Sequence, residues 1–300
     1  MNEWPVFFFS LLLQAATGLS VICFLHVLVL NSGMNDEMMW QWLRYPLLII
    51  ALLAIGGLAA SFAHLGYPRN APHAIRHITT SWMSREIFLT SGFIGLSVVM
   101  AVLSFWLSLF PPAIRDLIIS VSFGKPALFL SALLALSGLA ALFCMGELYR
   151  ATTVITWMSG YTHIAFSGAT AIMGGMLSYT LLQLQDFPAM LSATDMRYIT
   201  AIPLIFIYTG LGMEIAGMPC YTRYLEHSSS GHVVTYPHNP VIAYRSVSKL
   251  HNVRWGLAIT GISILTFTLW ASPHAVFIAA ALFLLIGSES LGRYIFFYIR

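Results

Sequence analysis

Residues 56–90, GGLAASFAHLGYPRNAPHAIRHITTSWMSREIFLT, contain the end of one apolar segment, a polar connection and the start of a second apolar segment. The first segment ends in His64, and the prolines that follow it stop the helix. The second begins with Arg85 and Glu86. Because helices that follow one another in the sequence usually lie side by side, His64 and Glu86 are expected at the same end of an antiparallel helix pair.

The composition excludes a soluble protein. Of the 300 residues, 58% are hydrophobic and 8% are charged, whereas a soluble domain carries about 25% charged residues. Charges inside a membrane are costly, so those that occur there are expected to pair or to serve function. The net charge of +3 is small and gives no indication of a nucleic-acid partner.

A membrane-spanning helix needs about 20 mainly apolar residues. The sequence therefore predicts an all-α polytopic membrane protein with eight transmembrane helices. They are expected at residues 5–30, 44–65, 85–110, 126–146, 162–184, 197–218, 253–271 and 274–298. We expect one integral-membrane domain, residues 1–300, with extramembrane loops at about 66–84, 147–161 and 219–252. No internal repeat is visible in the sequence.

An even number of spans places both termini on the same side of the membrane, and that side carries most of the basic residues. Those assigned to it are Arg69, Arg76, Arg85, Arg150, Arg223, Arg245, Lys249, Arg254 and Arg300. Those assigned to the opposite side are Arg44, Arg115, Lys125 and Arg197. The positive-inside rule then predicts that the termini face the cytoplasm, although a basic surface that docks an acidic subunit produces the same bias.

His64 and Glu86 have two interpretations. A neutral imidazole can hydrogen-bond the ring hydroxyl of a quinol, and a carboxylate can accept the released proton, so the pair suits a quinol site. In the other interpretation, His64 is an interfacial histidine, and Glu86 interacts with the positive end of its helix dipole. The spacing alone leaves both interpretations open.

Glu289 and Arg293 are four residues apart in the last span, so both side chains lie on one helix face. A structural ion pair is the default expectation because an unpaired charge in lipid is costly. The alternative is that they line a quinol pocket or a proton path. Tyr149 and Arg150 follow the fourth span, close to Glu147 and Trp157, and are either interfacial residues or part of the mouth of a site; Glu214 in the sixth span is similarly ambiguous.

The sequence offers no ligands for a redox cofactor of its own. Cys23, Cys144 and Cys220 are far apart and do not form the thiolate cluster that an iron–sulfur centre requires. His26 and His64 are the histidines in or at the spans that could face each other, and they lie toward opposite membrane surfaces, so a haem between facing helices is not expected.

The motifs resemble one family. ASFAHLGYPRNA at residues 60–71, followed by SREIFLTSGF at residues 84–93, is similar to the second-loop signature of the membrane anchor subunits of bacterial dimethyl sulfoxide reductases, the DmsC-like family. GSESLGRYIFFY at residues 287–298 resembles the last helix of this family, and EWPVFFFSLLLQ at residues 3–14 resembles its N-terminus. The similarity runs from end to end.

The resemblance implies an anchor without a redox centre in a three-subunit enzyme of the bacterial cytoplasmic membrane. Such an anchor oxidises menaquinol and holds an iron–sulfur subunit with four [4Fe–4S] clusters and a molybdopterin catalytic subunit that reduces an S- or N-oxide. The quinol-site histidine and glutamate of the family fall on His64 and Glu86. The remaining candidates for the pocket or its support are Arg85, Tyr149, Arg150, Glu289 and Arg293.

Two other functions remain open. The protein can be the quinone-linked anchor of a related reductase that acts on polysulfide, thiosulfate or tetrathionate, because the terminal chemistry belongs to another subunit. It can also be a proton-coupled transporter, which is expected to carry charged groups near the membrane midplane, often in paired repeats. Co-elution of iron–sulfur and molybdenum subunits with the purified protein separates the two anchors from the transporter.

Overall fold

The computed structural model describes residues 4–31, 33–34, 36–64, 75–106, 126–184, 192–228, 237, 239–270 and 274–299, except for the side chains of Asp36, His64 and Ile75. The long helices are α1 (Trp4–Leu30), α2 (Asp36–His64), α4 (Trp82–Trp106), α6 (Pro126–Arg150), α7 (Tyr161–Leu184), α8 (Ala193–Ser228), α10 (Ser248–Trp270) and α11 (Ala275–Tyr298). The short ones are η2 (Ile75–His77), η3 (Ile155–Trp157) and α9 (Pro240–Ser246).

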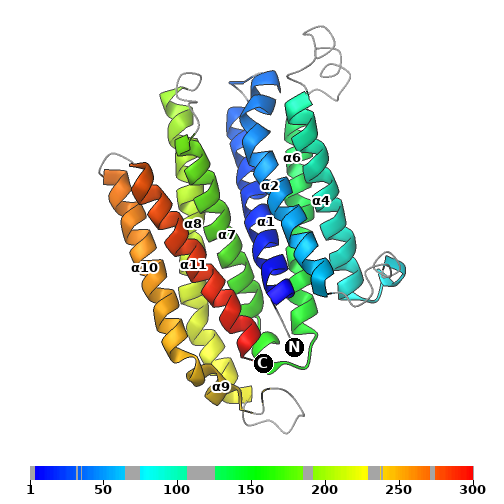
Figure 1. The fold of residues 1–300 in the computed structure, drawn as a ribbon, viewed down its shortest axis with the longest axis vertical. Coiled ribbons are helices and arrows are strands. Elements are labelled where there is room, and N and C mark those ends of the chain that lie inside the picture. Colours follow the sequence, from blue (N-terminus) through cyan, green and yellow to red (C-terminus); the bar gives the residue numbers. More distant parts are fainter. Residues whose placement is uncertain are drawn as a thin grey trace.

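All eight long helices are long and apolar enough to cross a membrane, as the sequence predicts. They run roughly parallel or antiparallel to one another, and both chain termini lie at the same end of the bundle (Figure 1). This end is called the terminal end below. The ends of α2, α6 and α8, which precede polar connections, also lie there, together with the beginnings of α4, α7 and α10 (Figure 1).

The bundle consists of two groups of four helices. In the first group α1 packs against α2 and α6, and α4 packs against the same two helices. In the second group α7 packs against α8 and α11, and α10 packs against α11. The groups meet mainly where α1 contacts α7. The described helices of each half of the sequence therefore form a group of their own.

Glycines allow α1 and α7 to approach closely. A Cβ atom added at Gly18 would overlap the backbone oxygen of Thr170, and one added at Gly174 would overlap the backbone of Gly18. Small residues at helix contacts allow membrane helices to pack backbone to backbone, where van der Waals contacts hold them together. The contact makes α1 and α7 the two most enclosed spans, whereas α10 and α11 expose much of their surface.

Two spans extend furthest beyond the bounds that the hydropathy pattern predicts. The second was expected from residue 44, but α2 begins at Asp36 and continues through Pro46. The sixth was expected at 197–218, but α8 runs from Ala193 to Ser228 and contains Pro203 and Pro219. The segment 219–252, predicted to be a loop, therefore contains the end of α8, all of α9 and the start of α10. Its residues 229–236 and 238 lie outside the described residues.

The connection between α6 and α7 is fixed to the end of the last helix. The indole Nε1 of Trp157 donates a hydrogen bond to the backbone oxygen of Phe296 at 2.7 Å. The hydroxyl of Thr156 donates to the backbone oxygen of Ile299 at 2.6 Å. Ile299 is the C-cap of α11, so these bonds use carbonyl groups at a helix end that would otherwise lack partners. They join the two halves of the protein at the terminal end.

Candidate functional site

The predicted site lies at the terminal end of the pair formed by α2 and α4. His64 is the last residue of α2, and Glu86 is the fifth residue of α4. The two helices pack against each other, and both residues belong to the ends joined by the connection 65–81 (Figure 1). The structure thus brings the two backbone positions to one end of one helix pair. The side chain of His64 and residues 65–74 lie outside the described residues.

Glu86 points into the protein, with 6% of its surface exposed. It shares one buried face of α4 with Thr90 and Phe93, and this helix packs against both α2 and α6. Within the described part of the protein, no hydrogen bond or ion pair to its carboxyl group is present. A buried carboxyl group without a protein partner is unusual, because most buried polar groups are hydrogen-bonded.

Arg85 holds the connection that precedes α4. Its guanidinium group donates hydrogen bonds to the backbone oxygens of Ile78 at 2.9 Å and Thr79 at 2.6 Å. The guanidinium carbon also lies 4.4 Å from the ring centroid of Trp82, in cation–π geometry. Arg85 therefore orders the backbone immediately before the helix that carries Glu86.

Arg150 and Tyr149 lie at the neighbouring end of α6 in different surroundings. Arg150 pairs with Glu147 at 2.6 Å, and the same carboxylate oxygen of Glu147 lies 2.7 Å from Nε2 of His163 on α7. Tyr149 is buried in an aromatic cluster, with ring centroids 5.3 Å from Trp157 and 5.4 Å from Phe296. Tyr149 is thus part of the packing between α6 and α11.

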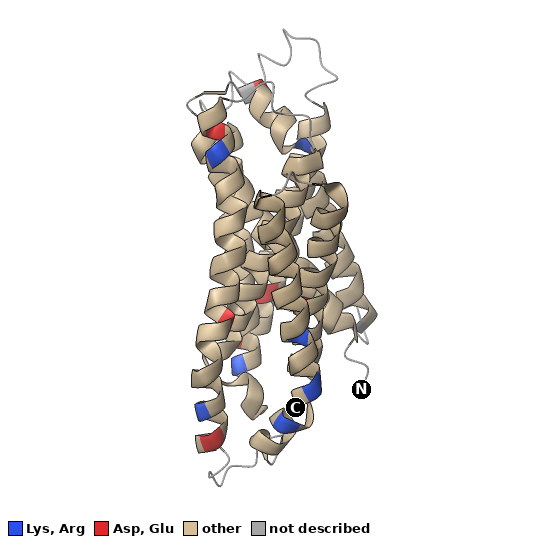
Figure 2. Ribbon diagram, turned by 90° about the vertical axis from the view of Figure 1, so that its left-hand side faces the viewer, with Lys and Arg blue, Asp and Glu red and all other residues tan. Residues whose placement is uncertain are grey.

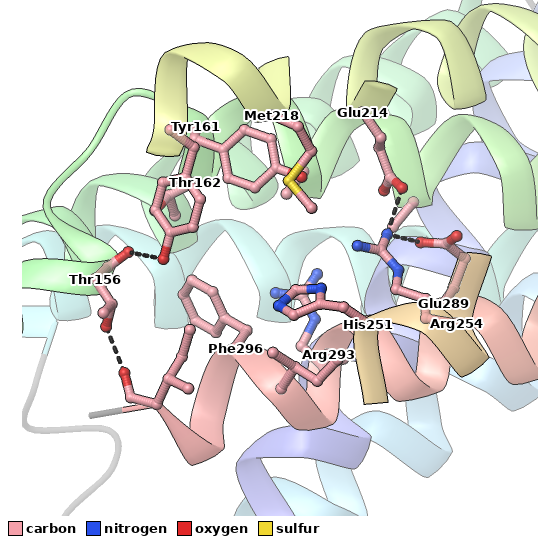
Figure 3. Close-up of a pocket in the computed structure, with 16 residues that line it drawn as sticks. Thr156, Tyr161, Thr162, Glu214, Met218, His251, Arg254, Glu289, Arg293 and Phe296 are labelled. Atoms are coloured by element: carbon pink, nitrogen blue, oxygen red, sulfur yellow. Dashed lines mark hydrogen bonds and ion pairs between the residues drawn. The ribbon is translucent and has the colours of Figure 1, made fainter. Parts of the chain in front are cut away.

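A second group of charged residues lies inside the other half of the bundle. Arg254 on α10 forms an ion pair with Glu214 on α8, and its Nη2 atom also lies 3.5 Å from Oε2 of Glu289 on α11. The three side chains are between 1% and 5% exposed. They are drawn together in Figure 3, where both carboxylates converge on one guanidinium group. We call Glu214, Arg254 and Glu289 the buried ion cluster.

The expected pairing of Glu289 with Arg293 is wrong. Arg293 instead donates a hydrogen bond of 2.6 Å to the side-chain oxygen of Gln14 on α1. Its guanidinium carbon lies 3.8 Å from the ring centroid of Phe166 on α7. No ion pair joins Glu289 to Arg293 among the residues that the structure describes. Each residue reaches across to another helix, because neighbouring helices supply closer partners than its own helix does.

The cluster borders a cavity at the terminal end of α7, α8, α10 and α11, with a volume of about 50 Å³. Glu289 and Arg293 line it, as do Tyr161 and His251, which sequence reasoning did not select. Arg254 was assigned to the basic surface, but it is 5% exposed and belongs to the buried ion cluster. The signal available in the sequence was one charged residue in each of three apolar segments, because charged residues inside a membrane protein usually pair with one another.

Most acidic and basic residues lie toward the two ends of the bundle, and few lie along its length (Figure 2). Among the described residues, no group of three or more His, Cys, Asp or Glu side chains is placed to hold a metal ion.

The comparisons with known proteins agree on one family. The profile of the DMSO reductase anchor subunit (DmsC) family matches residues 1–299. A chain of the anaerobic dimethyl sulfoxide reductase of Haemophilus influenzae is 27% identical over 229 residues, which cover 71% of this sequence and 72% of that protein. The YnfH chain of an anaerobic dimethyl sulfoxide reductase of Escherichia coli is 26% identical over 302 residues, which cover 99% of this sequence and 94% of that protein.

A shorter match reaches a different enzyme. One subunit of the sulfite dehydrogenase of Allochromatium vinosum is 35% identical over 98 residues, which cover 33% of this sequence and 28% of that protein. No solved structure matches the sequence. The family match spans nearly all of it, and the described residues contain eight helices long and apolar enough to cross a membrane. This chain is a membrane protein that belongs to the DMSO reductase anchor subunit family, whose members anchor molybdoenzyme complexes.

Proposed function

We propose that this anchor binds menaquinol at the terminal end of α2 and α4, oxidises it, and passes the electrons to an iron–sulfur subunit. The iron–sulfur subunit, which carries [4Fe–4S] clusters, relays them to a molybdopterin catalytic subunit. The complex serves anaerobic respiration in the bacterial cytoplasmic membrane. The anchor itself supplies the quinol site and the attachment to the membrane.

The observation that carries the proposal is the buried carboxyl group of Glu86. It is 6% exposed, has no hydrogen-bond partner among the described residues, and lies at the same end of adjacent helices as His64. Oxidation of a quinol removes electrons from the ring and releases the hydroxyl protons. A carboxylate without a protein partner is free to accept such a proton.

His64 has the complementary role. An imidazole nitrogen that accepts a hydrogen bond from a quinol hydroxyl orients the ring and takes part in the loss of its proton. His64 is the last residue of α2, and we expect its side chain near the membrane surface, where the released proton can leave to water. Arg85 supports the site from outside by fixing the backbone at Ile78 and Thr79.

The pocket walls proposed for this site come from α2, α4 and α6. Tyr149 and Arg150 are placed at the end of α6, and their partners there are Trp157, Phe296 and Glu147. We therefore assign Tyr149 and Arg150 a supporting role in the packing of that end. Glu289 and Arg293 belong to the cavity in the second half of the bundle.

The terminal substrate depends on the catalytic subunit. The matches to two dimethyl sulfoxide reductase chains favour an S- or N-oxide. The partial match to a sulfite dehydrogenase subunit favours a second candidate, a catalytic partner that acts on an inorganic sulfur compound such as polysulfide, thiosulfate or tetrathionate. Activity of the purified complex with each acceptor distinguishes the two.

Binding of a menaquinol analogue to membranes that contain the complex tests the quinol site. We expect His64→Ala to weaken binding at least tenfold, and Glu86→Gln to weaken it less because the amide keeps the shape of the carboxyl group. Glu37→Gln at the opposite end of α2 and His274→Ala at the N-cap of α11 are matched controls, and both are expected to bind normally. Equal affinity in all four variants would refute the site.

A further inference from the structure

The cavity beside the buried ion cluster does not belong to the proposed quinol site. Its walls come from α7, α8, α10, α11 and the connection that contains Thr156. Figure 3 shows side chains from all of these elements directed toward a common space. Its half-buried lining residues, Tyr161, Met218 and His251, belong to the parts of their helices nearer the terminal end.

The cavity reaches deep into the bundle. Its lining on α11 extends from Ile299 at the helix end inward to Glu289. At 1.5 Å of rise per residue this length is about 15 Å. Since the hydrocarbon core of a bilayer is about 30 Å thick, the cavity extends from one membrane surface to roughly half the depth of the membrane. The buried ion cluster lies at its inner end.

Several polar atoms on the wall lack a protein partner. They are Oη of Tyr161, Oε1 of Glu214, Nε of Arg254, Nε of Arg293 and both ring nitrogens of His251, all buried and without a hydrogen bond among the described residues. Glu214, Arg254 and Arg293 are between 1% and 5% exposed. Leaving a buried polar atom without a partner costs about 1 to 3 kcal/mol per group. So many in one cavity indicate a polar occupant.

The charges on the wall limit what the occupant can be. Two carboxylates, Glu214 and Glu289, face two guanidinium groups, Arg254 and Arg293, so the formal charges cancel. The wall therefore provides no excess charge to hold an anion or a metal cation. The unpartnered atoms include both donors and an acceptor, and water can serve both kinds because each molecule makes about three hydrogen bonds in a buried site.

We propose that this cavity is a water-filled half-channel that opens at the terminal end and hydrates the buried ion cluster, so that protons from one aqueous phase reach Glu214 and Glu289. The proposal is independent of the quinol site between α2 and α4. It gives the second half of the bundle a function that anchoring alone does not require. Polar and ionisable groups inside membrane proteins commonly mark such routes.

The groups that face the cluster from each neighbouring element are titratable or polar. They are Tyr161 on α7, Tyr221 on α8, Tyr244 on α9, His251 on α10, Arg293 on α11 and, through Arg293, Gln14 on α1. The Tyr244 and His251 rings are 4.7 Å apart, and burial raises the pKa of Tyr244, which keeps this phenol neutral. Tyr161, Tyr221 and His251 line the cavity, and Tyr244 packs against His251 beside it.

Cysteine accessibility in the intact complex tests the half-channel. Cys23, Cys144 and Cys220 are first replaced by serine or alanine. Single cysteines are then placed at Ala165 and Ala169, which line the cavity on successive turns of α7. Both changes add one sulfur atom. Labelling uses a charged methanethiosulfonate that does not cross membranes, applied separately to right-side-out and inverted vesicles.

The half-channel predicts that Ala165→Cys and Ala169→Cys react, each from one side of the membrane, the side that carries the chain termini. Two controls should not react. Ile215→Cys is next to Glu214 in the sequence but faces outward with 54% of its surface exposed, and Ala141→Cys lies in the fully buried core. Labelling of Ala169→Cys at least tenfold faster than both controls is the expected result.

Two results would overturn the proposal. If Ala165→Cys and Ala169→Cys are as unreactive as Ala141→Cys in a complex that is assembled and active, the ion cluster is a dry structural network. If both react but a menaquinol analogue protects them, the occupant is a quinone and the water-filled channel is wrong. Neither result bears on His64 and Glu86, whose readout is quinol binding.

Discussion

Arg293 on the last helix donates a 2.6 Å hydrogen bond to the side-chain oxygen of Gln14 on the first helix. Both residues are buried, and the guanidinium group also stacks over the ring of Phe166 on α7. The arginine therefore ties α11 to the helices at the centre of the bundle, across the boundary between the two four-helix groups. This role differs from that of a partner for Glu289 on the same helix.

The Gln14–Arg293 contact predicts that replacing Gln14 alone is more damaging than replacing both residues. Gln14→Leu removes the hydrogen-bond acceptor of a buried cation, and a hydrogen bond to a charged group contributes about 1.5 to 3 kcal/mol, so the amount of complex in the membrane should fall. The double variant Gln14→Leu with Arg293→Leu should recover much of it, because the guanidinium group that lost its partner is removed as well. Immunoblots of membranes and melting in detergent measure both. A normal level of Gln14→Leu would contradict the role of this contact.

The buried ion cluster predicts which charges are coupled. A double-mutant cycle between Glu214→Gln and Arg254→Gln should give a coupling energy of about 1 to 3 kcal/mol, as contacting charges do. The cycle between Glu289→Gln and Arg293→Gln should give a smaller value, because these residues form no direct pair. Thermal stability of the purified complex is the measurement. A larger coupling energy in the second cycle would show that Glu289 and Arg293 form an ion pair within α11.

The close approach of α1 and α7 is tested with glycine substitutions. Gly18→Ala and Gly174→Ala each place a methyl group against backbone of the other helix, which must then move away. Overpacking of this kind typically costs about 1 to 3 kcal/mol, so both variants should assemble poorly and melt at lower temperature. Gly95→Ala is the control, because a Cβ atom there meets no neighbour within 4 Å. Similar melting of all three variants would show that α1 and α7 can separate at little cost.

Docking of the iron–sulfur subunit at the terminal end follows from the proposed quinol site, because electron transfer requires a short distance to the first cluster. A cysteine at Thr79, which is exposed beside α4, should cross-link to the iron–sulfur subunit. A cysteine at Thr194, exposed at the opposite end of the bundle, should not. Mass spectrometry of the cross-linked complex identifies the partner. Cross-links from Thr194 alone would show that the iron–sulfur subunit docks at the opposite end of the bundle, which contradicts the proposal.

Most of the fold follows from hydropathy, but its helix ends do not. Apolar length predicts eight spans, and the eight long helices confirm them. The start of α2 was missed because Asp36, Glu37 and Arg44 lower the hydropathy without preventing a helix, and Pro46 is tolerated inside it. In the same way, α8 continues through Pro219 into a polar sequence. Both helices therefore continue beyond the apolar residues that identify a membrane span in the sequence.

The candidate sites were only partly accessible to sequence reasoning. The connection between two neighbouring helices brings the positions of Glu86 and His64 to one end, and this can be inferred from the order of the helices alone. The partners of Glu289 and Arg293 cannot be inferred from helix order. These partners, Arg254 and Gln14, come from helices whose positions depend on packing. A spacing of four residues identifies a shared helix face, but it does not show which neighbouring helix covers that face.

The central claim is that His64 and Glu86 serve the oxidation of menaquinol rather than assembly. The most direct test is the ratio of menaquinol-driven activity to activity from an artificial donor that reduces the iron–sulfur subunit, measured in assembled complexes that carry His64→Ala or Glu86→Gln. We predict that this ratio falls at least tenfold in both variants while artificial-donor activity stays near the wild-type value. A wild-type ratio in both variants would contradict the account and leave the two residues as ordinary groups at a membrane interface.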